Sequence, residues 1–313
     1  SQLKRKGVID SFSSKKELAD FTLNDGVYLG FNGIISFKSA NELREIVKTT
    51  PIEQIILDEN PKGLLVIPAD NPTGQFLNQN QLIDLARICV KNNIWIISDE
   101  AYRQLVYTDD KSSSIWKITE DDVPGITGSR ISIESSSKVW NACGLRIGGL
   151  VTDNNEFHTK SVSEYTANLC ANAIGQNIFG ALAHETHSQL NNWYKSQRDY
   201  YKDLIVPLRE NLLKEIPGLI VSKPEAAIYF VIDFKHICNK DFDARDFINY
   251  CASDGKVSIE GIDYTLLLAP MNGFYSDPNK GKTQMRVAMV ESKDFIEKMP
   301  LVLSSLYSNY LIT

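Results

Sequence analysis

A run of small residues, SSSKVWNACGLRIGG from Ser135 to Gly149, contains one lysine and one arginine eight positions apart. Lys138 supplies an amine directly after three serines, and Arg146 supplies a planar guanidinium whose paired N–H groups suit a phosphate. An amine and a guanidinium set among hydroxyls in one short segment make this run a candidate for binding a ligand.

Further polar residues stand where other apolar runs stop. Asn71 lies in DNPTG just after LLVIP, and Asp99 and Tyr102 lie in DEAY just after IWIIS. Lys138 follows RISIES in the same way. In an open α/β sheet the ligand binds beyond the carboxyl ends of the strands, so we expect these side chains to reach one crevice.

A late arginine joins this set by the alternation of its neighbours. In QMRVAMV, Met285, Val287 and Met289 fall on one face of an expected strand, and Arg286 points to the opposite face. We expect that face to line the crevice. An exposed arginine in a peripheral ion pair is the alternative.

The elements that must position these residues follow from hydrophobic spacing. Short branched runs predict strands over 64–68, 94–98, 130–135 and 147–152. Between the first two, helical spacing follows Asn78, and Gln81 three residues later predicts a capping box. Strand, helix and strand in this order form a crossover unit, so we expect a mainly parallel sheet covered by helices.

The second half of the chain has a different character. Long helical stretches occupy roughly 164–215, and AIYFVIDF, a helix near 244–252, LLLAP, QMRVAMV and a helix over 293–310 follow. We therefore predict two domains, a large one over 1–205 and a smaller α+β domain over 206–313.

Composition excludes several classes of function. The 313 residues are 43% hydrophobic and carry a formal net charge of -6, which allows a sizeable core and argues against a nucleic-acid partner. No apolar run is long enough for a membrane span. Five scattered cysteines suit a reducing compartment, so we expect a cytoplasmic protein without disulfides.

Competing motifs fail on spacing. His184 and His187 are three apart, whereas the zinc helix HExxH needs four, so no metal site is predicted. GKT at Gly281 lacks the glycine of a P-loop, because Ser276 stands five positions earlier. The chain contains no GxSxG elbow and no GxGxxG after a strand.

The four motifs NPTG, DEAY, SSSK with GLRIGG, and MRVAMV resemble those of fold-type I pyridoxal-phosphate (PLP) enzymes, specifically the aspartate-aminotransferase-like class I/II aminotransferases. The resemblance runs from about Pro61 to the C-terminus. It implies an α/β fold of the PLP-dependent transferase type. The large domain would hold a mostly parallel sheet of the seven-stranded kind with helices on both faces, and the C-terminal α+β domain would be smaller.

The resemblance also implies roles for residues that would face PLP. Lys138 would form the Schiff base with the aldehyde and then move protons as acid and base. Asp99 would keep the ring nitrogen protonated, although a strand-terminal Asp can also cap the following turn. Asn71 and Tyr102 would hydrogen-bond the phenolic oxygen of the ring, although Asn71 also suits a turn.

The remaining roles concern the two anionic groups, phosphate and carboxylate. Ser135 and Arg146 would hold the PLP phosphate, and Arg286, with Asn71 beside it, would bind the α-carboxylate of the substrate. Together these residues predict transfer of an amino group between an amino acid and a 2-oxo acid, with PLP as cofactor.

Several points about the reaction, the N-terminal segment and association stay open. Another PLP reaction, such as C–S β-elimination or decarboxylation, would use the same residues, and a shortened non-catalytic relative is also possible. Similar enzymes have a phosphate-binding turn some eighty residues before NPTG, which is not identifiable here, and 1–60 is left unassigned. Family members are commonly homodimers, so we expect association.

Overall fold

The computed structural model describes residues 62–110, 112–167, 171–275, 277 and 279–312, together with the backbone of two short strands, β1 (Val8–Ile9) and β2 (Tyr28–Leu29). β1 and β2 pair in parallel. Contacts divide the chain into one unit of 1–62 with 273–280 and a second of 63–272 with 281–313. The second unit contains every candidate site residue.

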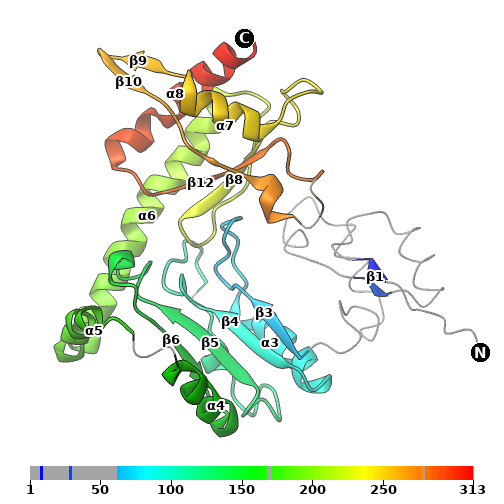
Figure 1. Cartoon of the computed structure of the whole chain (residues 1–313), viewed down its shortest axis with the longest axis vertical. Helices are drawn as coiled ribbons and strands as arrows, with labels where there is room; N and C mark the ends of the chain where they lie inside the picture. Colours follow the sequence, from blue (N-terminus) through cyan, green and yellow to red (C-terminus); the bar gives the residue numbers. More distant parts are fainter. Residues whose placement is uncertain are drawn as a thin grey trace, which may run out of the picture. The chain divides into compact units, whose positions relative to one another are not determined.

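The first sheet of this unit has the strand order β3-β4-β5-β6. Its strands are β3 (Gly63–Val66), β4 (Trp95–Asp99), β5 (Arg130–Ser135) and β6 (Gly148–Thr152). The first three are parallel, and β6 runs antiparallel to β5. Consequently β3, β4 and β5 end at the same edge, as the sequence predicted (Figure 1).

The helix α3 (Gln79–Lys91) covers one face of this sheet. It begins at the predicted capping box: the Asn78 side chain accepts from the N–H of Gln81, and the Gln81 side chain accepts from the N–H of Asn78. Leu82, Ala86 and Cys89 are buried against Ile96 of β4. The 3-10 turn η3 (Ile115–Lys117) closes the same small core.

Helices follow the first sheet in the chain. The turn η4 (Cys143–Leu145) precedes β6, and α4 (Asn155–Thr166), α5 (Ala173–Gly180) and η5 (Ala181–His184) come after it. The long helix α6 (His187–Glu215) then begins at a second capping box, formed by Thr186 and Gln189. In Figure 1, α6 runs from α5 to the second sheet, so it spans both halves of the unit.

The second sheet has the order β11-β12-β8-β7. Its strands are β7 (Ile220–Val221), β8 (Tyr229–Asp233), β11 (Ala269–Pro270) and β12 (Gln284–Ala288), all in antiparallel pairs. The predicted alternation in β12 is confirmed, because Met285, Val287 and Met289 are buried and Arg286 faces the other way. Arg286 is half-buried.

Two helices and a separate hairpin accompany the second sheet. They are α7 (Ala244–Ser253), the final helix α8 (Lys293–Tyr310), and the hairpin of β9 (Val257–Ile259) and β10 (Ile262–Tyr264). The turn η6 (Met271–Phe274) follows β11. Phe230, Phe234 and Phe247 are fully buried, and the Phe234 and Tyr307 ring centroids lie 4.7 Å apart. Packed aromatic rings therefore hold α7 and α8 to the sheet.

The expected α/β class is confirmed, with a mixed first sheet and a smaller antiparallel one. Of the seven strands implied for the large sheet, the described residues supply four. The segment 1–60, left unassigned from the sequence, lies outside the described residues apart from the backbone of β1 and β2. The division at residue 205 falls within α6 and stays a prediction.

A glycine couples the NPTG turn to the second sheet. Gly74 has a φ of 70°, and its carbonyl accepts from the N–H groups of Glu225 and Ala226. A Cβ on Gly74 would lie 2.1 Å from the carbonyl oxygen of Tyr229, which is backbone and cannot rotate away. Only glycine fits this contact.

We predict that Gly74→Ala lowers the free energy of unfolding by about 2 kcal/mol or more, because it adds both a left-handed-region penalty and a backbone clash. The control is Gly180→Ala at the end of α5, where a Cβ meets nothing within 4 Å. Urea titration followed by circular dichroism measures both. Equal stability of the two variants would refute the proposed contact.

Candidate active site

The parallel strands deliver the predicted side chains to one edge of the first sheet. Asn71 lies in the turn after β3, Asp99 is the last residue of β4, and Lys138 lies in the turn after β5. The Nζ atom of Lys138 lies 5.9 Å from the centroid of the Tyr102 ring. The lysine and the DEAY tyrosine are therefore neighbours, as expected from the strand order.

A row of contacts continues from Tyr102 to the second sheet. The hydroxyl oxygens of Tyr102 and Tyr229 lie 2.8 Å apart, and their rings meet edge to face. The guanidinium carbon of Arg286 lies 4.7 Å from the Tyr229 ring centroid. Arg286 Nη1 then donates to Asn71 Oδ1 at 2.9 Å. The row Lys138, Tyr102, Tyr229, Arg286 and Asn71 thus joins residues from both sheets.

Tyr102 is buried, with 5% of its surface exposed. Burial is the largest cause that raises the pKa of its phenol, and the hydrogen bond and charge of Tyr229 and the charge of Asp99 raise it further. The charge of Arg286 acts in the opposite direction. Tyr102 therefore stays protonated at neutral pH and can donate a hydrogen bond.

Asp99 already has one local partner. Its Oδ1 accepts from the N–H of Ala101 at 3.1 Å, which is the turn-capping arrangement considered as the structural alternative. Its charge also acts on Tyr102. One carboxylate oxygen therefore fixes the turn, and the side chain remains at the edge of the sheet where Tyr102 and Lys138 lie.

Ser135 and Arg146 are placed differently from the other candidates. Ser135 Oγ accepts from the N–H of Ser137, so it orders the turn that carries Lys138. Arg146 is exposed, has a φ of 55°, and donates from Nη1 to the carbonyl of Cys143. Among the described residues, no contact joins Arg146 to Lys138 or Ser135. The predicted phosphate role of both residues stays a prediction.

The buried carboxylate of Glu100 joins the DEAY turn to the segment that begins η3. The Glu100 side chain has no exposed surface and accepts from Arg103 Nη1 at 2.5 Å, Ser114 Oγ at 2.7 Å and the N–H of Ile115 at 2.8 Å. Arg103 also bonds Glu134 of β5 at 2.9 Å. Burial alone would lower the pKa of Arg103, but the two carboxylates outweigh it and raise that pKa. This network ties the DEAY turn to β5.

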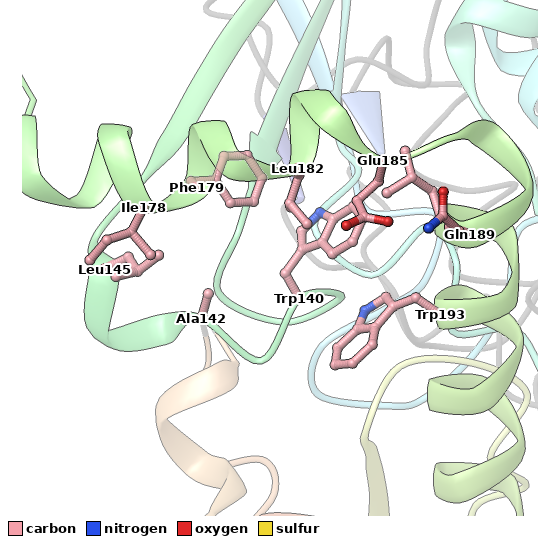
Figure 2. Close-up of a pocket in the computed structure, with 10 residues that line it drawn as sticks. Trp140, Ala142, Leu145, Ile178, Phe179, Leu182, Glu185, Gln189 and Trp193 are labelled. Carbon is pink, nitrogen blue, oxygen red and sulfur yellow. The ribbon is translucent and has the colours of Figure 1, made fainter.

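An apolar pocket is lined by Trp140, two residues after Lys138, and by side chains of α5 and α6 (Figure 2). Its volume is about 410 Å³, and the Trp140 and Trp193 rings in it are nearly parallel with centroids 6.3 Å apart. Trp140 also meets Phe179 edge to face, and Trp193 Nε1 donates to the carbonyl of Val139. Since Val139 and Trp140 directly follow Lys138, this packing anchors the lysine turn to α5 and α6.

A second pocket opens at the lysine itself. It has a volume of about 490 Å³, and its lining includes Lys138, Asn141, Tyr201, Ile228 and Met289. The hydroxyl of Tyr201 donates to the Oδ1 of Asn141 at 3.3 Å. Lys138 therefore lines a cavity that has room for a small molecule, whereas the other candidate site residues are not among the residues that line it.

The sequence did not identify Tyr229, Glu100 or Trp140 as part of the site. Tyr229 stands in the apolar run AIYFVIDF, where its hydroxyl gives no local signal of a distant partner. Glu100 lies beside Asp99 in DEAY, and a buried glutamate with three partners cannot be inferred from its neighbours. Among the described residues no cluster of metal ligands occurs.

The family model for aminotransferase class I and II matches residues 40–290. The chain belongs to this family. The match begins upstream of Pro61, where the motif resemblance had been placed, and it contains every candidate site residue. A second family model, TatD related DNase, matches residues 1–59, and none of the candidate site residues lies in that range.

Individual aminotransferases are also similar to this chain in sequence. Alanine aminotransferase 2 of Panicum miliaceum is 26% identical over 259 residues, 78% of this chain and 51% of the relative. Aspartate aminotransferase of Bacillus subtilis (strain 168) is 25% identical over 246 residues, 77% of this chain and 56% of the relative. The chain therefore spans about half the length of these curated relatives.

Solved structures of aminotransferases are similar to this chain in fold. N-succinyldiaminopimelate aminotransferase from Mycobacterium tuberculosis has a TM-score of 0.64 at 18% identity, with 84% of this chain and 61% of that chain covered. At such low identity the comparison shows the fold alone. The two sheets and the helices between them are thus arranged as in an aminotransferase.

We predict that Glu100→Ala destabilises the protein by about 3 to 5 kcal/mol, because it leaves the hydroxyl of Ser114 and the N–H of Ile115 without their acceptor and leaves Arg103 with Glu134 alone. Glu156→Ala is the control, since Glu156 and Lys160 form an exposed ion pair, which contributes little to stability. Chemical unfolding measures both changes. A similar small loss for both variants would contradict a structural role for the buried network.

Proposed function

We propose that this protein is a PLP-dependent aminotransferase that moves an amino group between an amino acid and a 2-oxo acid. The observation that carries the proposal is the row of contacts from Lys138 through Tyr102 and Tyr229 to Arg286. It joins an amine that can hold an aldehyde to a guanidinium that can hold a carboxylate. Membership of the class I and II family supports this assignment.

The residues present fit PLP at the end that carries its ring. An amine, a phenol, a carboxylate and an amide, from Lys138, Tyr102, Asp99 and Asn71, meet at one edge of the first sheet. These are the donor types that an aldehyde, a phenolic oxygen and a protonated ring nitrogen need.

When bound, PLP supplies an aldehyde that joins an amine and a ring that accepts the electron pair left at the substrate Cα. Lys138 is the amine that would hold the aldehyde, and its Nζ would afterwards carry the proton to and from the substrate. Tyr102 and Asn71 would donate hydrogen bonds to the phenolic oxygen. Asp99 would favour a proton on the ring nitrogen by its negative charge.

The anionic groups require separate partners. Arg286, oriented by Asn71, holds the α-carboxylate of the amino acid and keeps its Cα near Lys138. Ser135 and Arg146 would hold the phosphate of PLP, and Arg146 would have to give up its present bond to the carbonyl of Cys143. The proposed substrates are an amino acid and a 2-oxo acid, and the chain is proposed to act as a homodimer in the cytoplasm.

None of the helices among the described residues could span a membrane.

The proposed site residues would also hold the amino acid for C–S β-elimination or decarboxylation, because the bond that breaks depends on substrate orientation. Analysis of the products formed with 2-oxoglutarate separates these reactions from amino transfer. A non-catalytic relative would give no product at all.

We predict that borohydride reduction in the presence of PLP labels Lys138, as read by peptide mass mapping. Lys138→Ala loses the label, and any amino-transfer rate falls by about 10² to 10⁴-fold or more. Lys160→Ala is the control, because Lys160 is an exposed partner of Glu156 on α4 and keeps both label and rate. A label on another lysine, or none in the unmodified protein, would refute the proposal.

A further inference from the structure

Tyr229 is the residue that touches both halves of the proposed site. It is the first residue of β8, and 5% of its surface is exposed. Its hydroxyl lies 2.8 Å from the hydroxyl of Tyr102, and its ring lies 4.7 Å from the guanidinium carbon of Arg286. One side chain therefore contacts the residue proposed for the cofactor and the residue proposed for the substrate carboxylate.

The strand register produces the contact with Arg286. Tyr229 pairs with Ala288 and Val231 pairs with Arg286, so Tyr229 and Arg286 are diagonal neighbours on one face of adjacent strands. Diagonal neighbours are within reach of aromatic and long side chains. A guanidinium on a phenol ring gains from both cation–π attraction and stacking.

A second contact fixes the guanidinium from another side. Arg286 Nη1 donates to Asn71 Oδ1, and the ring of Tyr229 lies against the guanidinium carbon. An arginine held at two points loses little further freedom when it binds a carboxylate. The ring of Tyr229 thus acts on carboxylate affinity without touching the carboxylate.

The hydroxyl of Tyr229 acts on the other end of the site. The two hydroxyl oxygens lie 2.8 Å apart, and either can be the donor. A hydroxyl has one proton, so when Tyr102 gives its proton to another acceptor, Tyr229 is the donor in this pair. The bond that Tyr102 then accepts polarises its O–H, so Tyr229 strengthens the hydrogen bond that Tyr102 can give.

We propose that Tyr229 is a positioning residue with two separable functions: its ring orients Arg286 for a carboxylate, and its hydroxyl sets how strongly Tyr102 donates to bound PLP. This inference rests on the proposed function. Because the ring and the hydroxyl can be removed one at a time, each function has its own variant and its own readout.

The first readout is the dissociation constant of propanoate, measured by calorimetry on the PLP-loaded protein. Tyr229→Leu removes the ring and weakens binding by about 2- to 30-fold, the range of a cation–π contact. Tyr229→Phe keeps the ring and changes the constant less than the leucine variant does. Equal affinity of the leucine variant and the unmodified protein would overturn the role of the ring.

The second readout is the pH midpoint of the absorbance change of bound PLP. In Tyr229→Phe, Tyr102 loses the hydrogen bond that it accepts and donates less strongly to the phenolic oxygen, which then attracts the proton on the Lys138 nitrogen more. The midpoint rises by about 0.4 to 1 pH unit, the equivalent of one hydrogen bond. A midpoint that is unchanged or falls would overturn the role of the hydroxyl.

Tyr307→Phe is the matched control. Tyr307 is also buried, its hydroxyl donates to the carbonyl of Ile237 at 2.8 Å, and its ring packs against Phe234 and Phe247, none of which is a candidate site residue. We expect this variant to move neither readout. If PLP does not label Lys138 in the unmodified protein, the proposed function fails; if it does and Tyr229→Phe leaves the midpoint in place, only the inference on Tyr229 fails.

Discussion

The hydrogen bond from Arg286 to Asn71 is the interaction on which the site depends. It joins residues 215 positions apart, one on β12 of the second sheet and one in the turn after β3 of the first. Nearby backbone contacts hold the same connection: Glu225 and Ala226 donate to Gly74, and Tyr107 donates to Glu225. Without them, the amine of Lys138 on one sheet and the guanidinium of Arg286 on the other, which we propose binds a carboxylate, would have no fixed relation.

Burial decides how the polar groups at this junction behave. Tyr102 and Tyr229 are each 5% exposed, so their hydroxyls bond to each other, because a buried hydroxyl without a partner is costly. The buried carboxylate of Glu100 likewise has hydrogen-bond partners, because it accepts from three donors. Lys138 is only half-buried and lines an open cavity. The structure therefore keeps its supporting groups inside and its reactive amine accessible to a ligand.

Much of this arrangement could be predicted from the sequence because it depends on local signals. The capping box of Asn78 and Gln81, the end of β5 at Ser135 and the alternation around Arg286 all follow from neighbouring residues. Tyr229 could not be predicted, because its partners depend on strand register and on the approach of two sheets. The exposed position of Arg146 likewise follows from a local left-handed backbone that the motif does not reveal.

The central claim is that side chains from separate strand ends converge on one molecule of PLP. A crystal structure of the protein grown with PLP tests it most directly. The account predicts continuous density from Lys138 Nζ to the cofactor, with Asp99 at the ring nitrogen and Arg146 at the phosphate. PLP bound elsewhere, or density at Lys138 with Asp99 and Tyr102 out of contact, would contradict it.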